Sequence, residues 1–152
     1  MMMGRTLSNE LLQGFDYSKT KMNINNYFAY LHELELEQAR LNAGYGLTGN
    51  YDFSVEYQRQ PYIPVRKDEF NLSAKENNDE EIKKYLEGFK WAKSILTEQE
   101  QSYIIEYFMN GKYEDEIVDL LGFSSSDSRA FRNLKREAVY KFAYVLNLIV
   151  KN

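Results

Sequence analysis

The sequence predicts a mainly α-helical fold, in which a helical N-terminal region with one extended segment is linked to a C-terminal unit of four helices. Three observations predict this fold. Apolar residues recur at helical spacing along most of the chain. Residues 51–57 instead alternate strictly between apolar and polar, as a half-buried strand does. A polar stretch at 66–78 reads as a linker, so we expect domains at 1–75 and 76–152.

Composition limits the class of protein. The chain has 152 residues, enough to bury a real core, with 13 Tyr and 9 Phe and no Cys. The absence of cysteine, of a secretory signal and of an apolar run long enough to cross a bilayer favours a cytoplasmic protein with no membrane partner. The formal net charge of −4 disfavours a protein that coats nucleic acid through its overall field.

The N-terminal half contains one strong helical pattern. A short helical turn is expected at residues 7–13, and a long helix at 23–43 with Asn23 as N-cap and Gly44 as C-cap. We expect His32 to have a surface or helix-packing role, because no second His or Cys accompanies it as a metal ligand. The segment 51–57 must pair with a copy of itself, lie over helices, or belong to an unrecognised hairpin.

The C-terminal half begins with two predicted helices. The first starts at Asn78 or Asp79 and continues to Ile95, with Trp91 as a core anchor. Thr97 and Glu100 have the spacing of a capping box, which opens a helix at residues 98–109. The Asn-Gly pair at 110–111 ends that helix.

Residues 111–141 have the order of a helix-turn-helix. Ile117, Leu120 and Leu121 share one face of a short helix, and Gly122 supplies the left-handed residue that ends it. Phe123 is expected to turn back to the core, and the serines at 124–126 offer N-caps for a second, basic helix. In proteins with this order, the second helix enters the major groove of DNA.

The second helix has two contrasting faces. Its apolar stripe consists of Phe131, Leu134, Ala138, Phe142, Val145 and Ile149. The opposite face carries guanidinium and amide groups, which read base edges or grip phosphates. The predicted DNA-binding residues are Ser126, Ser128, Arg129, Arg132, Asn133, Lys135, Arg136 and Tyr140. The alternative interpretation is an ordinary solvated helix with surface charge.

Charge is unevenly distributed along the chain. From residue 129 to 152 there are six Lys or Arg against Glu137 alone, whereas residues 97–122 have seven acidic residues against Lys112 alone. A local basic face on an acidic body favours site-specific over indiscriminate binding. The chain has no Gly-rich phosphate loop, no defensible catalytic triad and no calcium-loop spacing. We therefore expect a protein that is not an enzyme and has neither metal nor cofactor.

These residues also carry a family resemblance. The run ILTEQEQSYIIEYFMNGKYEDEIVDLLGF, followed by a Ser-rich turn and LKREAVYKFA, resembles region four of bacterial sigma factors. More closely, the chain is similar to the ArpU family of phage late-gene transcriptional regulators, since DYSKTKMNINNYFAYLHELELEQA resembles the opening block of that family. The resemblance covers residues 15–150. The spacing between Gly122 and the Lys-Arg pair at 135–136 is longer than the sigma-like pattern.

The resemblance implies a sequence-specific DNA-binding regulator of phage or prophage late genes for packaging, structure or lysis, in a Gram-positive host. A phage small terminase subunit is one alternative, because it also joins a helix-turn-helix to oligomerising helices. An adaptor for RNA polymerase or a sigma factor, with little DNA affinity of its own, is another. The apolar residues at 138–150 need two neighbours, of which one is their own domain and the other is the first long helix or a second subunit. Because two-fold dimers suit pseudo-palindromic DNA sites, we expect a homodimer on double-stranded DNA.

Overall fold

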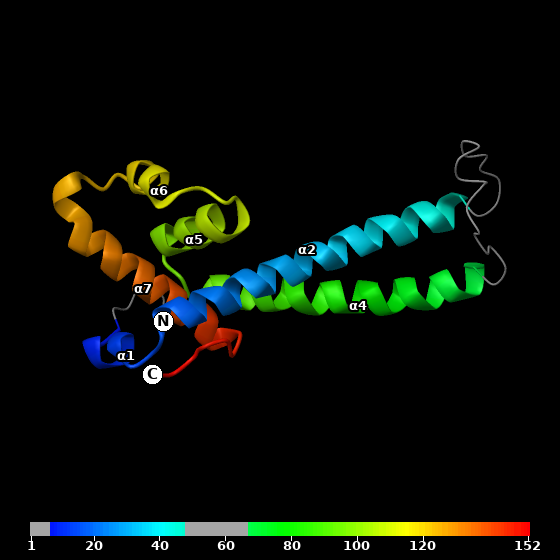
Figure 1. Ribbon diagram of the computed structural model, residues 1–152, viewed down its shortest axis with the longest axis horizontal. Helices are drawn as coiled ribbons and strands as arrows, with labels where there is room; N and C mark the ends of the chain where they lie inside the picture. The colour runs from blue at the N-terminus through cyan, green and yellow to red at the C-terminus, as the bar shows by residue number, and fades with distance from the viewer. Residues whose placement is uncertain (1–6, 48–66) are drawn as a thin grey trace. The chain divides into compact units, whose positions relative to one another are not determined.

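The computed structural model describes residues 7–47 and 67–152, and these residues are mainly α-helical, as the sequence predicts. They form two compact units (Figure 1). Unit 1 comprises residues 7–29 and 86–152, and unit 2 comprises the described part of residues 30–85. The predicted extended segment 51–57 lies outside the described residues.

The first two helices of the chain are α1, Asn9–Gln13, and α2, Tyr17–Leu47. Ser8 caps α1, so the predicted turn at residues 7–13 is confirmed. The predicted start of the second helix at Asn23 is wrong. Asp16 opens α2 instead, because its Oδ1 accepts the Lys19 amide at 2.9 Å. The helix also continues past Gly44, the predicted C-cap.

Helix α4, Lys67–Ser94, begins well before its predicted start, so the expected linker at 66–78 is helical from Lys67 on. The boundary placed at residues 75/76 falls within this helix, and the two compact units divide the chain elsewhere. Asn78, a predicted N-cap, is a buried residue in the middle of α4. Its Nδ2 donates to the Leu34 carbonyl at 3.0 Å. This tertiary contact outweighs the weak helix propensity of asparagine.

Unit 2 consists of α2 from residue 30 on and α4 up to residue 85, which run antiparallel (Figure 1). Leu31, Leu34 and Ile82 form its small apolar core, with Tyr85 packed against them. A polar contact joins the helices beyond this core, where Gln38 Nε2 donates to Asp79 Oδ1 at 2.8 Å. In the described part of the unit, the two helices are joined by this apolar core and by hydrogen bonds from the side-chain amides of Gln38 and Asn78.

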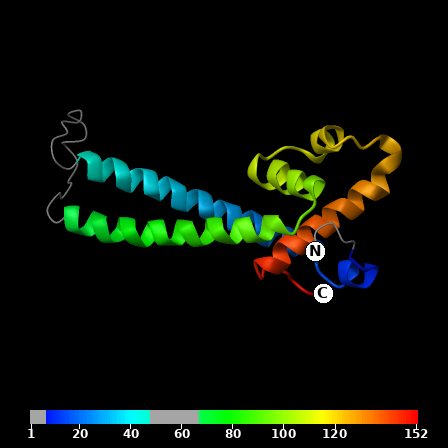
Figure 2. The ribbon, with the colours of Figure 1, turned by 180° about the vertical axis from the view of Figure 1, so that it is seen from behind.

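Unit 1 contains the remaining helices, which Figure 2 shows from behind. Thr97 and Glu100 close the predicted capping box, with Thr97 N donating to Glu100 Oε1 at 2.9 Å and Glu100 N to Thr97 Oγ1 at 3.2 Å. The predicted stop at 110–111 is also confirmed, since Gly111 has φ +69°. The elements after α4 are α5, Glu98–Ile104; the π-helical turn η1, Ile105–Met109; α6, Glu114–Leu120; the 3-10 turn η2, Ser125–Asp127; and α7, Ser128–Val145.

Aromatic rings fill the core of unit 1. Phe28 of α2 stacks on Phe142 of α7, with ring centroids 5.7 Å apart, and on Phe108 at 6.3 Å. Tyr103 of α5 meets Phe131 edge-on at 6.0 Å. Helices α2, α5 and α7 and the turn η1 thus all contribute rings to this core.

Trp91 was predicted as a core anchor, and this prediction is wrong: its side chain is 67% exposed. Ala92 and Leu96, four residues apart, are fully buried and define the inward face of this part of α4. Trp91 lies about 100° around the helix from Ala92, which turns the indole to solvent.

The C-terminal tail of unit 1 packs against the N-terminal segment. Helix α7 ends at Val145, so the apolar run to residue 150 is not one continuous helix, and Asn147 has φ +59°. Beyond this turn, Val150 O accepts the Asp16 amide at 2.7 Å and Val150 N donates to Thr20 Oγ1 at 3.0 Å. Helix α2 therefore provides one of the neighbours that the apolar residues at 138–150 require.

Candidate nucleic-acid interface

Helix α6, the following turn and α7 follow the predicted helix-turn-helix order. Ile117 is fully buried and Leu121 half-buried, whereas Leu120, expected on the same inward face, is 55% exposed. Gly122 has φ +82°, the left-handed conformation predicted for it. Phe123 turns back to the core and meets Phe131 edge-on, with ring centroids 5.5 Å apart.

The serine run forms a separate 3-10 turn before α7. Ser124 N donates to Asp127 Oδ2 at 3.0 Å, so this carboxylate caps the start of the 3-10 turn η2. Helix α7 then starts at Ser128. The serines were predicted to cap the second helix directly, and the structure corrects this. The residues between Gly122 and α7 therefore include an additional 3-10 turn.

Helix α7 separates an apolar face from a polar one. Phe131, Ala138 and Phe142 of the predicted stripe are buried, Leu134 is half-buried, and Val145 is 38% exposed. Ile149 packs on the core from beyond the end of the helix. Away from this face, the polar side chains exposed to solvent in the first two turns are Ser128, Arg129, Arg132 and Asn133.

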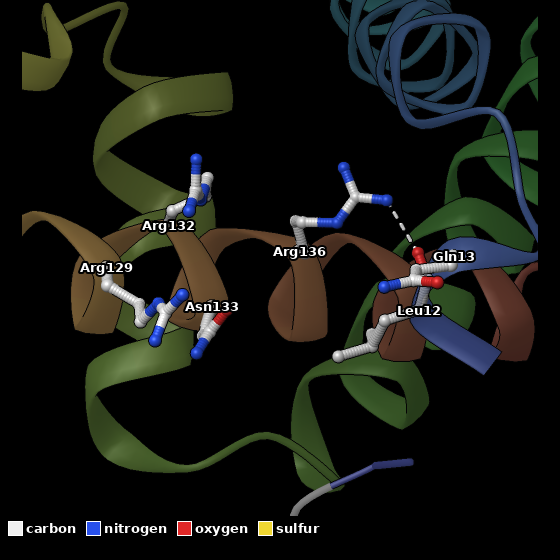
Figure 3. Close-up of a pocket in the computed structure, with 6 residues that line it drawn as sticks. All are labelled: Leu12, Gln13, Arg129, Arg132, Asn133 and Arg136. Carbon is white, nitrogen blue, oxygen red and sulfur yellow. Dashed lines mark hydrogen bonds between the residues drawn. The ribbon is translucent and has the colours of Figure 1, made fainter. Parts of the chain in front are cut away.

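A polar hollow of about 540 Å³ lies between α1 and α7 (Figure 3). Its lining brings together four of the predicted DNA-binding residues and two residues of the N-terminal segment that sequence reasoning missed. The six are Leu12, Gln13, Arg129, Arg132, Asn133 and Arg136. No sequence signal pointed to the first two, because they lie more than a hundred positions from the basic helix.

Arg136 is the most firmly held of these arginines. Its Nη2 donates to the Leu12 carbonyl at 2.6 Å (Figure 3). Its guanidinium carbon lies 5.4 Å from the ring centroid of Phe15 and 5.1 Å from that of Tyr17. Stacked on two rings and bonded to a carbonyl, this guanidinium has a fixed position.

Lys135 and Tyr140 do not join the exposed polar group. The Lys135 ammonium pairs with Glu114 Oε1 at 2.9 Å, and the side chain is only 18% exposed. Since Tyr103 Oη donates to the other Glu114 oxygen at 3.1 Å, this carboxylate ties α5, α6 and α7 together. Tyr140 is half-buried and meets Phe15 edge-on at 5.1 Å. Both residues stabilise unit 1.

Ser126, the remaining predicted site residue, is exposed in the 3-10 turn, with its Oγ 2.8 Å from that of Ser124. His32 is also exposed, as expected. Among the described residues, no group of three His, Cys, Asp or Glu side chains is placed to hold a metal ion. None of the described helices is both long enough and apolar enough to cross a membrane.

Comparisons with protein-family models, with curated proteins and with solved structures found no match to this chain.

Proposed function

We propose that this protein binds double-stranded DNA through the first turns of α7 and regulates transcription. The observation that carries the proposal is the grouping of Arg129, Arg132 and Asn133 on the exposed side of a helix whose other side is buried. Guanidinium forks match guanine O6 and N7, and an asparagine amide matches adenine N6 and N7. The helix-turn-helix order of α6 and α7 is the arrangement that inserts such a helix into the major groove.

The resemblance to the ArpU family supplies the biological setting of the proposal. The regulated genes are then the late genes of a phage or prophage, and the protein acts in the cytoplasm of the bacterial host. The protein is a binding protein with no catalytic role in this proposal. A homodimer suits a two-fold operator, and Tyr144 and Val145 remain exposed near the end of α7 as a surface for it. Solution mass at micromolar concentration tests the dimer, and a monomer refutes it.

Recovery of bound DNA from the host genome tests the proposal most broadly. Enrichment of fragments upstream of late genes supports a regulator. Enrichment of packaging sites, together with a ring-shaped oligomer, supports the terminase-like alternative. Recovery of no DNA refutes both DNA-binding proposals.

The surface of helix α6 favours a second candidate function, that of a protein-binding adaptor. Its exposed side chains include Asp115, Glu116 and Asp119, with Tyr113 at 79% and Leu120 at 55% exposure beside them. An acidic surface with exposed apolar groups suits docking on a basic patch of a partner such as RNA polymerase or a sigma factor. Capture of polymerase without retention of DNA supports this adaptor, and loss of capture on charge reversal at Asp119 tests the surface.

A further inference from the structure

The N-terminal segment that lines the hollow opposite α7 is fixed by burial and hydrogen bonds. Leu12 is 6% exposed, and its carbonyl accepts from Arg136. Gln13 O accepts Asn152 Nδ2 at 2.8 Å, and Phe15 forms an antiparallel bridge with Lys151. Residues 151 and 152 thus hold this segment from one side and Arg136 of α7 from the other, within the same compact unit. The Gln13 side chain remains exposed at the rim.

The hollow has an excess of positive charge. Its lining includes three guanidinium groups and no carboxylate. Among the described residues, the ion pairs involve Lys135 and Lys141 of α7 but none of the arginines of this helix. Three cations around one hollow repel each other, and an anion placed between them relieves this repulsion.

The donors suit a phosphate group. An arginine has five N–H donors, and Arg136 uses one on Leu12 O, which leaves others while fixing the orientation of the fork. The side chain of Gln13 lines the same hollow as this guanidinium (Figure 3). An amide N–H and a fixed guanidinium are both able to donate to oxygens of one phosphate.

We propose that the hollow between α1 and α7 seats one phosphate of the DNA backbone, gripped by Arg136 and Gln13. This inference rests on the proposed DNA binding and extends the interface from the helix-turn-helix to the N-terminal segment. Arg136 then positions the duplex. Arg129 and Arg132 add positive charge around the hollow and, with Asn133, keep N–H donors for base edges. Phosphate contacts of this kind fix the register of a recognition helix.

Substitution of Gln13 tests the inference without touching α7. The probe is a duplex selected by the wild-type chain from a random pool. Gln13→Glu brings a negative charge to the phosphate and should weaken binding about fivefold at low salt, and Gln13→Arg should strengthen it by a similar factor. The matched control is Asn26→Asp, an equal charge change at an exposed position of α2 in the same unit. This control should change affinity less than twofold.

A neutral methylphosphonate placed at each backbone position in turn then identifies the phosphate. At one position, the difference between wild type and Gln13→Glu should vanish, because the charge that they sense is gone. Equal affinities of wild type, Gln13→Glu and Gln13→Arg for unmodified duplex overturn the inference while leaving DNA binding intact. Failure of wild type to select any duplex overturns the proposed function itself.

A titration with inorganic phosphate alone tests whether the hollow binds a free anion instead of a phosphate of the DNA backbone. If it shifts the NMR signal of the Gln13 side-chain amide at millimolar concentration while the Gln13 variants bind duplex like wild type, the hollow serves a free anion and the backbone assignment is wrong. If the Gln13 variants change duplex affinity in opposite directions, the backbone assignment is supported.

Discussion

Lys141 is a buried cation at the centre of unit 1, and its removal tests how the helices of this unit are joined. Its Nζ donates to both Glu100 oxygens at 3.1 Å and lies 3.7 Å from Glu137 Oε2. The side chains of Lys141 and Glu100 are only 7% and 4% exposed. Lys141→Met therefore leaves two buried carboxylates without their cation.

Breaking a buried ion pair from one side costs about 3–5 kcal/mol, because the remaining charge is neither paired nor solvated. That is a large fraction of the roughly 5–15 kcal/mol that stabilises a typical domain. At about 2–4 °C per kcal/mol for a chain of this size, we expect the melting temperature to fall by about 6–20 °C. Urea denaturation followed by circular dichroism gives the free energy, and calorimetry gives the temperature.

A second variant separates lost charge pairing from lost packing. Adding Glu100→Gln to Lys141→Met removes one of the two uncompensated carboxylates, the less exposed one. It keeps the bond to Thr97 N, since glutamine also closes a capping box. The double variant should recover much of the loss. Lys90→Met, at an exposed position on α4, is the control and should be nearly neutral. A Lys141→Met cost below about 1 kcal/mol, or a double variant less stable than the single one, refutes the reasoning.

Three further outcomes follow from single residues. Burial raises the pKa of the Glu137 carboxyl above 4.5, with Glu100 adding to this and Lys141 opposing it, so the folded chain retains a proton that the unfolded chain releases. The contribution of Glu137 to stability should therefore fall as pH rises from 4.5 through the folded pKa. Urea denaturation midpoints measured against pH should show this decrease for wild type and a smaller one for Glu137→Gln. The same pH profile for both proteins contradicts the prediction. Trp91 should fluoresce as a solvated indole and be quenched by acrylamide in the folded protein; protection until unfolding means that it is buried. Gly122 has φ +82°, and a Cβ added there meets no atom within 4 Å. Gly122→Ala should therefore lower the free energy of unfolding by about 1–2 kcal/mol from backbone strain alone, as measured by urea denaturation. An unchanged stability contradicts the left-handed turn.

Local signals in the sequence predicted the features that neighbouring residues determine. The Thr97–Glu100 capping box and the left-handed Gly122 each depend on a few consecutive positions, and both are present. Features fixed by distant contacts were missed. Asn23 resembles an N-cap, yet it lies inside α2 with its amide bonded to the Leu148 carbonyl. Asn78 is held inside α4 in the same way, by Leu34.

The same distinction between local signals and distant contacts applies to the candidate site. The exposed positions of Arg129, Arg132 and Asn133 followed from helical periodicity alone. Periodicity does not say that Arg136, on the same face, is held by α1, because that contact joins residues 124 positions apart. It also misses the pairing of Lys135 with Glu114, which depends on how α6 packs on α7. Long-range contacts thus decide how each member of a basic face is held and which of its donors stay free.

The affinity of Arg132→Ala for a duplex selected by the wild-type chain tests the central claim most directly. Arg40→Ala is the matched control, because it removes an exposed arginine of unit 2 and the same charge. Fluorescence anisotropy should show a loss of about 1–3 kcal/mol for Arg132→Ala if it reads a base edge, or a salt slope lower by about one if it grips a phosphate. The control should bind like wild type. Equal affinity and equal salt slope for Arg132→Ala and wild type would contradict DNA binding through α7.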